Sequence, residues 1–187
     1  MNATLSGEAF NRLVGAVKAF VDKRGSRIPC NTLIHILFST EECKATAYAL
    51  DGYRAAKESV VCGSVDETFD VLISVPRLKA AKSSIVEVCR EGDKSIVDYG
   101  DIQFHTKNPG GELFDVETAI SAEANKPKRM AFGINADYMI DALRSLKESG
   151  AAIGNPVIVE FTSPLAPILM RTDKDNYKMV LPVRIRE

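Results

Sequence analysis

The chain repeats one order of secondary structure three times, and this recurrence limits its fold more than any other feature. In each copy a short strand pattern leads into a helix pattern, and three more strands follow. The helices are predicted at 8–22, 75–83 and 136–149, after short strands at 3–5, 69–74 and 129–134. The strand groups are predicted at 32–39, 44–50 and 53–62, at 85–90, 94–99 and 101–106, and at 157–162, 168–172 and 178–185. Helices on one face of largely antiparallel sheet make an α+β fold.

The three predicted helices have start and stop signals. Ser6 can cap the first helix, and Gly25 can end it. Pro76 suits the first turn of the short second helix, where a missing N–H costs nothing. Asn135 can cap the third helix, and Gly150 can end it. These signals support the helix assignments.

The composition indicates a cytoplasmic globular protein. The 187 residues carry a net charge of −1, so binding to a polyanion would need local clusters of positive charge. No apolar run is long enough for a membrane span, and no signal-peptide pattern opens the chain. The four cysteines have no paired C-x-x-C spacing, which indicates reduced thiols and no zinc site. We therefore expect no membrane partner, no metal and no cofactor.

Catalytic motifs are missing from the sequence. His35 and His105 both lie in predicted strands, and neither belongs to a recognisable nucleophile motif. The glycine-rich turn Asn108–Gly111 is not followed by the Lys-Ser/Thr start of a phosphate-binding helix. These observations predict a protein without catalytic residues. A small α+β enzyme would need a deep polar cleft beside one of the two histidines.

The last eleven residues, Tyr177–Glu187, alternate apolar and polar side chains as a half-buried strand does. Pro182 interrupts this pattern, and a proline in a sheet belongs at an edge because it cannot donate a hydrogen bond. Two interpretations are open. The segment is either an ordinary edge strand or an apolar surface, with arginine at its rim, that a partner binds.

The segments from Phe132 to Arg186 and from Ala49 to Ala55 resemble two motifs of the bacterial DNA polymerase III beta sliding clamp family. The segment from Phe132 to Arg186, FGINADYMIDALRSLKESGAAIGNPVIVEFTSPLAPILMRTDKDNYKMVLPVRIR, is similar to the last half-domain of that family. Upstream, Ala49–Ala55 (ALDGYRA) is similar to the clamp turn ATDG(H/Y)RLA. The chain departs from that turn at Leu50 and Ala55, where the family usually has Thr and Leu. Both positions would lie beside the partner-binding pocket.

The resemblance implies a domain organisation. Residues 1–120 would form one complete clamp-like domain, the middle domain, from two copies of the repeat. Residues 121–187 would form a linker and the second half of the last domain. A lone half leaves a helix face and a sheet edge uncovered, so we expect another chain to complete it. The homo-oligomer could be a dimer with paired halves or a tetramer that forms a ring.

The resemblance also implies a groove that binds peptides of polymerases and other replication proteins. The Asp51-Gly52 dipeptide by itself predicts a hairpin turn. In the family this turn lies near the C-terminal strand, and the two form the groove. Carried over, the groove residues are Gly52, Tyr53, Arg54, Ala55, Leu165, Pro167, Met179, Val180, Leu181, Pro182, Val183 and Arg184.

Clamp helices line a central hole and contact DNA phosphates without reading bases. The predicted second helix is the most basic, whereas acidic residues offset the cations of the third. The implied contacts with double-stranded DNA are Arg12, Lys18, Lys23, Arg24, Arg77, Lys79, Lys82, Arg144 and Lys147. A solvated helix face is the alternative, and for the third helix we prefer it.

The resemblance therefore implies a sliding-clamp-like DNA polymerase processivity factor that encircles or tethers to DNA and binds partner peptides. The alternative is a clamp-derived interaction or decoy module that does not encircle DNA. Both interpretations describe a protein without catalytic activity. The number of chains in the assembly separates them.

Overall fold

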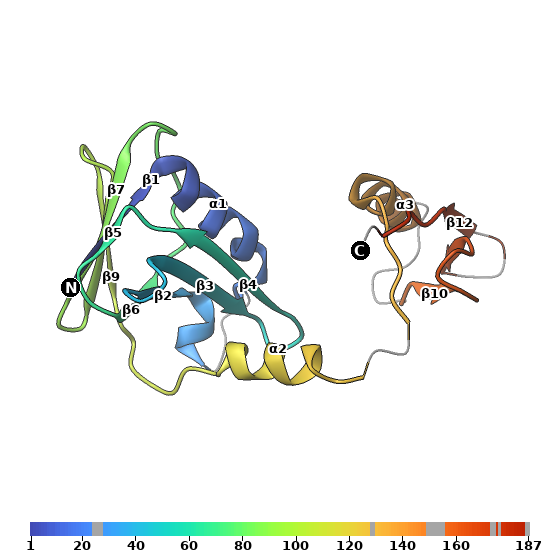
Figure 1. The fold of residues 1–187 in the computed structure, drawn as a ribbon, viewed down its shortest axis with the longest axis horizontal. Helices are drawn as coiled ribbons and strands as arrows, with labels where there is room; N and C mark the ends of the chain where they lie inside the picture. Colours follow the sequence, from blue (N-terminus) through green and yellow to red (C-terminus); the bar gives the residue numbers. More distant parts are fainter. Residues whose placement is uncertain (24–27, 128–129, 149–155, 173–174, 176, 186–187) are drawn as a thin grey trace. The chain divides into compact units, whose positions relative to one another are not determined.

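Helices and antiparallel sheets form an α+β fold, as predicted (Figure 1). A computed structural model describes residues 1–23, 28–127, 130–148, 156–172, 175 and 177–185. Two compact units follow one another, Met1–Asn125 (unit 1) and Lys126–Glu187 (unit 2). The helices are α1 (Gly7–Val17), α2 (Val116–Ala124) and α3 (Ala136–Glu148). The strands are β1 (Asn2–Ser6), β2 (Ile34–Ser39), β3 (Lys44–Leu50), β4 (Ala55–Val61), β5 (Ser64–Val65), β6 (Phe69–Ile73), β7 (Ile85–Glu91), β8 (Lys94–Asp98), β9 (Gln103–Lys107), β10 (Ile158–Glu160), β11 (Ile168–Arg171) and β12 (Tyr177–Val180).

Unit 1 contains two sheets, and each sheet combines strands from two copies of the repeat. The first half runs from β1 to β5, and the second half runs from β6 to β9. One sheet has the order β4-β3-β2-β6, and the other has the order β5-β1-β7-β8-β9. Strand β6 of the second half thus pairs with β2, and β1 of the first half pairs with β7, both antiparallel. Each half supplies the other with one strand.

Helix α1 lies along β3 and β4 and covers the inner face of their sheet (Figure 1). It buries Phe10, Leu13, Val14 and Val17, the face that the helical spacing predicts. The Ser6 hydroxyl caps the helix by accepting a hydrogen bond from the Ala9 N–H at 3.2 Å. The helix is shorter than predicted because a 3-10 turn, Lys18–Phe20, takes over after Val17.

The predicted second helix at 75–83 is wrong. The segment 74–84, here called the basic loop, contains no helix and lies against α1, with a single turn closed by the Ser84 N–H on the Ala81 carbonyl at 3.0 Å. The Asn11 side chain donates to the Ala80 carbonyl at 2.8 Å and accepts from the Ala80 N–H at 3.0 Å. The Gly7 N–H donates to the Ser84 carbonyl at 2.8 Å. A helix of so few residues is marginal by itself, and these bonds to α1 stabilise a non-helical backbone instead.

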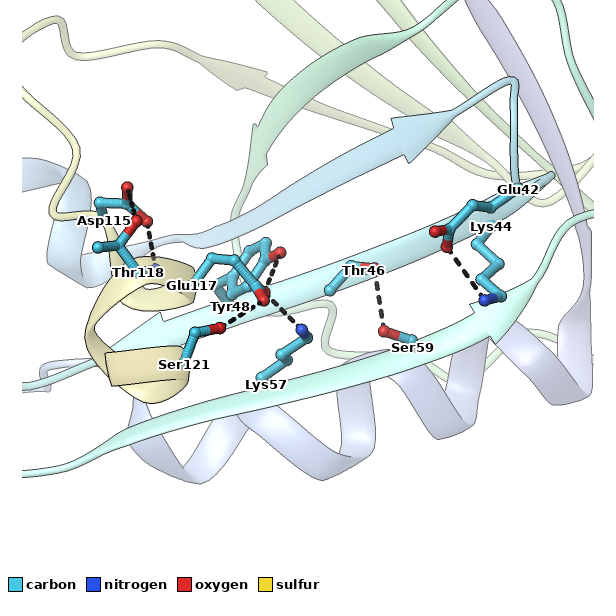
Figure 2. Close-up of polar contacts among 10 residues, drawn as sticks. All are labelled: Glu42, Lys44, Thr46, Tyr48, Lys57, Ser59, Asp115, Glu117, Thr118 and Ser121. Carbon is cyan, nitrogen blue, oxygen red and sulfur yellow. Dashed lines mark hydrogen bonds and ion pairs between the residues drawn. The ribbon is translucent and has the colours of Figure 1, made fainter. Parts of the chain in front are cut away.

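Helix α2 extends into the start of the 121–187 segment, where a linker is expected. Figure 2 shows how α2 is attached to the outer face of β3 and β4. Glu117 accepts a hydrogen bond from the Tyr48 hydroxyl at 2.9 Å and forms an ion pair with Lys57. The hydrogen bond from Lys57 is the main cause that lowers the pKa of Glu117. Asp115 caps the helix through the Thr118 N–H at 2.8 Å.

Unit 2 has one three-stranded sheet, β10-β11-β12, and the helix α3. Its buried core consists, among the described residues, of Ala142, Leu146, Ile168, Met170 and Val180. All four predicted strands of unit 2 are shorter than expected, and 157–162 and 168–172 are reduced to β10 and β11. The described part of 129–134 makes a single bridge, from Gly133 to Val183. Strand β12 ends at Val180, because Pro182 has no N–H with which to continue the ladder.

Candidate peptide-binding and DNA-binding surfaces

The turn between β3 and β4 has the shape that Asp51-Gly52 predicts. Gly52 has a φ of 84°, in the left-handed region that favours glycine. The Asp51 carboxylate accepts from the N–H groups of Tyr53 and Arg54, both at 3.2 Å, and from the Arg54 Nε at 2.8 Å. The Arg54 hydrogen bond is the largest of the effects that lower the Asp51 pKa. The turn is therefore locked by its own side chains.

This turn borders a hollow of about 510 Å³, here called the turn hollow. Its lining is Val21, Asp22, Lys23, Asp51, Tyr53 and Arg54. Tyr53 is 93% exposed, so its ring is free to contact a ligand. Arg54 donates to the Ala19 carbonyl at 2.9 Å and lies over the Phe20 ring, which fixes its guanidinium at the wall.

A second hollow, of about 620 Å³, lies beside β12 and α3 and is here called the tail hollow. Its lining is Tyr138, Asp141, Ala142, Tyr177, Lys178, Met179, Val180 and Leu181. Met179 and Leu181 are exposed, whereas Val180 belongs to the core of unit 2. An apolar concave surface beside a strand suits leucine or phenylalanine side chains of an extended peptide.

The other implied groove residues lie outside the linings of both hollows. Leu165 and Pro167 are exposed in the turn before β11, and Arg184 is exposed after β12. Val183 pairs with Gly133, its N–H donating to the Gly133 carbonyl at 2.9 Å. The turn hollow belongs to unit 1 and the tail hollow to unit 2, so each surface stands on its own geometry.

Sequence reasoning missed part of both linings. The segment Val21–Lys23 lines the turn hollow because folding brings it beside the β3–β4 turn. No motif within the segment itself predicts this contact. Lys23, an implied DNA contact, lines this hollow. Tyr138 was recognisable as a member of the apolar face of α3, and its exposure could have marked it as a binding residue.

The basic loop brings three implied DNA contacts to the surface of unit 1. Arg77, Lys79 and Lys82 are exposed, and no described residue forms an ion pair with them. Lys79 and Lys18 line the same shallow hollow, of about 40 Å³, between the loop and α1. Arg12 is tied to β4 by an ion pair with Glu58 at 2.7 Å. Loop and helix together thus present a cluster of cations.

The remaining implied DNA contacts are more scattered. Arg144 and Lys147 are exposed on α3, which also carries Asp137 and Asp141. This mixed charge is the pattern of a solvated helix face. Arg24 lies outside the described residues.

His35 lies beside a hollow of about 290 Å³ whose lining is His35, Leu37, Tyr48, Leu113, Phe114, Asp115, Val116 and Glu117. Its Nε2 is 3.1 Å from the Asp70 carboxylate, which also pairs with Arg90 at 2.6 Å. Burial lowers the His35 pKa, although Asp70 opposes this effect, so the ring tends to be neutral. His35 thus links β2 to its neighbour β6. His105 is exposed on β9.

Other classes of site find no support in the part of the chain that is described. No group of three metal-ligating side chains occurs there. None of its helices is both long and apolar enough to span a membrane. The four cysteines are free, and burial raises the pKa of the Cys62 thiol to about 12.

Solved structures of similar architecture are bacterial clamps. The DNA polymerase III beta chain of Streptococcus pneumoniae TIGR4 matches 98% of this chain, with a TM-score of 0.71 and 14% identity. A Pseudomonas aeruginosa sliding clamp bound to griselimycin also matches 98%, with a TM-score of 0.71 and 15% identity. The Helicobacter pylori beta clamp bound to a DNA ligase peptide matches 97%, with a TM-score of 0.62 and 16% identity.

The chain has the sliding-clamp fold. It spans about half the length of these clamps, 50% of the S. pneumoniae chain and 51% of the other two. No protein-family model and no curated protein sequence matches it. At such low identity the likeness establishes the clamp architecture of this chain.

Proposed function

We propose that the chain is a clamp-like, non-catalytic processivity factor that encircles or tethers to DNA in the cytoplasm and binds partner peptides in a hydrophobic groove. The observation that carries this proposal is that both implied parts of the groove coincide with hollows on a clamp fold. A third feature, the basic loop beside α1, suits DNA contact.

The proposed peptide site has two parts, the turn hollow of unit 1 and the tail hollow of unit 2. Tyr53 and Arg54 line the first part, and Met179 lies beside Leu181 in the second. The apolar side chains bury a leucine or phenylalanine anchor, and Arg54 binds a carbonyl or carboxylate of the peptide. The H. pylori clamp with a DNA ligase peptide supports this class of ligand for the fold.

The proposed DNA contact is electrostatic and independent of sequence. Lysine and arginine side chains neutralise phosphates and release counterions, so affinity falls steeply with salt. Arg77, Lys79 and Lys82 are suited to this role because their charges are not neutralised by ion pairs with described residues. With a net charge of −1, the whole chain adds no long-range attraction to DNA.

In this proposal, unit 1 corresponds to the middle domain of a clamp and unit 2 to the second half of the last domain. Three halves in one chain leave one half without a partner to complete its domain. The active form is therefore a homo-oligomer, and DNA polymerase or another replication protein binds through the groove.

Met179→Asp should weaken binding of a fluorescein-labelled peptide with leucine and phenylalanine anchors by about 30-fold, a loss of roughly 2 kcal/mol typical of an interface hot spot. Met179 is exposed, so the charge leaves the fold intact while it disrupts the apolar wall. Fluorescence anisotropy measures the dissociation constant. Ile102→Asp is the matched control, because Ile102 is also exposed but lines neither hollow. Equal affinities for the Met179 variant and the unaltered chain would contradict the groove.

A further inference from the structure

Unit 1 shows how two halves of this fold complete each other. Strand β1 of the first half pairs with β7 of the second, and β6 of the second half pairs with β2 of the first. The strand before the helix position of each half thus pairs with the first strand after the helix position of the other. This exchange is reciprocal, as in a two-fold symmetric interface.

Unit 2 matches the first half of unit 1 element by element. Helix α3 corresponds to α1, and Asn135 caps it as Ser6 caps α1, accepting from the Asp137 N–H at 2.9 Å. Strands β10, β11 and β12 correspond to β2, β3 and β4. The Gly133–Val183 bridge corresponds to the pairing of β1 with β5. Segment 130–134 therefore stands where β1 stands in unit 1.

Two strand positions that are filled in unit 1 are occupied by no described strand in unit 2. Strand β2 has β3 on one side and β6 on the other, whereas β10 has β11 and no other described strand. Strand β1 has β5 on one side and β7 on the other, whereas segment 130–134 makes its one described bridge to Val183. Open edges of this kind readily pair with another chain.

Apolar side chains at the open edge of β10 are exposed on the side that faces the core. Val159 pairs with the buried Met170, so both point to the same face of the sheet. Val159 is nevertheless 46% exposed, and Phe161, two residues further, is 43% exposed. The corresponding Ile36 and Phe38 on β2 are both 0% exposed, because β6 and its half cover them. Unit 2 lacks the cover that a second half provides.

We propose that unit 2 dimerises with unit 2 of a second copy of this chain, so that segment 130–134 of each copy pairs with β10 of the other. Segment 130–134 of each copy would fill the vacant position beside β10 of the other copy. A single two-fold axis relates the two pairings. Unit 1 has no half to spare, since its two halves already pair with each other. The interface between the two chains would thus have the same strand pairing as the interface between the two halves of unit 1.

The charges are compatible with self-pairing. Segment 130–134 and β10 together carry one charged side chain, Glu160. The residues that meet across the two ladders are otherwise apolar or glycine, so no like charges oppose each other at the axis. Glu160 is already paired with Arg171 of its own chain at 3.0 Å.

Unit 1 also gives the register of the new ladder. Phe132 lies three residues before the cap Asn135, as Ala3 lies before Ser6 and Val71 before Ser74. Val71 is opposite Ile36. Val159 holds the place of Ile36, because the buried pair Ile168–Val180 matches Ala45–Val60 in the adjoining hairpin. Phe132 should therefore lie opposite the partner's Val159, and Ala131 opposite the partner's Glu160.

Native mass spectrometry of the full chain tests this interface with two neighbouring substitutions. Val159→Asp would bury an unpaired charge at each of two symmetric sites and should raise the dimer dissociation constant at least about a hundredfold. Ile158→Asp is the matched control, because Ile158 is exposed to a similar extent, 39%, but faces the other side of the sheet. If the chain stayed monomeric, both side chains would be exposed to solvent, and the two substitutions would change the stability of the chain to a similar extent. A monomeric unaltered chain, or a dimer that survives Val159→Asp, would overturn the proposal.

A cysteine pair tests the register directly. The test uses a chain that carries both Ala131→Cys and Glu160→Cys. In the proposed register position 131 of one copy lies directly opposite position 160 of the other, and residues so placed in an antiparallel ladder are close enough for a disulfide. Oxidation should give a covalent dimer on a non-reducing gel, and each single variant should give none. A covalent bond formed only within one chain would contradict the exchange between copies.

The dimer goes beyond the proposed function, and the two fail separately. Val159 and Phe132 line neither the turn hollow nor the tail hollow. Loss of peptide binding in the Met179→Asp variant with an intact dimer would support both proposals. A dimer that binds no peptide would leave the interface standing and refute the groove.

Discussion

Replacing Gly7 with alanine should lower the free energy of unfolding of unit 1 by about 3 kcal/mol, the upper part of the usual range for overpacking. A Cβ at this position would lie 1.9 Å from the Ala81 carbonyl oxygen. That oxygen belongs to the backbone of the basic loop, which the Gly7 N–H also holds at Ser84. The loop would have to leave α1 to make room. Chemical denaturation followed by circular dichroism measures the change.

The matched control is Gly15→Ala in the same helix. A Cβ there would meet no atom within 4 Å. Alanine is favoured over glycine inside a helix by roughly 1 kcal/mol, so this variant should be more stable than the unaltered chain. The two substitutions are chemically identical and should act with opposite signs. If Gly7→Ala stabilised unit 1 as Gly15→Ala does, the close approach of α1 to the basic loop would be wrong.

Charge reversal in the basic loop should have the largest effect on DNA binding. Changing Arg77, Lys79 and Lys82 to glutamate should weaken binding to double-stranded DNA at least about a hundredfold at about 50 mM salt. The salt dependence should also become shallower, by about one unit of slope for each phosphate that is no longer neutralised. Fluorescence titration of a labelled duplex at several salt concentrations measures both quantities.

A variant with Lys94→Glu and Lys107→Glu, which lowers the net charge by four against six for the loop variant, controls for charge reversal elsewhere on unit 1. These two residues are exposed on β8 and β9 and are not implied in DNA contact. Their reversal should change affinity far less than reversal in the basic loop. Equal reductions of affinity in the two variants would mean that the basic loop has no special role, and the DNA surface would then have to be sought elsewhere.

Long periodic elements were predictable from the sequence. The apolar spacing of α1 and α3 matches a helix, and the alternation in 44–50 matches β3, whose bounds agree with the prediction. The β3–β4 turn was predictable too, because Gly52 supplies the positive φ that an Asp-Gly turn needs. These features depend on residues that are close in the chain.

The elements that were predicted wrongly depend on interactions between distant residues. The basic loop has a proline where a helix could start, yet Asn11, far away in the sequence, holds the Ala80 backbone through two hydrogen bonds in a loop without helix. Helix α2 was recognisable in principle, since Asp115 is a good cap and Glu117 suits the first turn. Its apolar residues are not gathered on one face, so no helical spacing marked it. Only Val116 of this helix is buried, and Glu117 attaches it through an ion pair and hydrogen bonds.

The candidate site was predictable only in part. The turn and the terminal strand could be named because each has its own sequence motif. Segment 21–23 could not, because only folding brings it to the turn. The exposed Val159 and Phe161 were predicted simply as strand residues, and the missing cover became visible by comparison with β2 in unit 1.

The central claim is that the chain binds partner peptides through both the β3–β4 turn and the terminal strand. The affinities of the Tyr53→Ala and Met179→Ala variants for the labelled peptide, measured by fluorescence anisotropy, test it most directly. Each substitution removes an exposed side chain that lines a hollow, and each should cost about 1–2 kcal/mol of binding free energy, roughly a 5- to 30-fold loss of affinity. Unchanged affinity in either variant would contradict the claim.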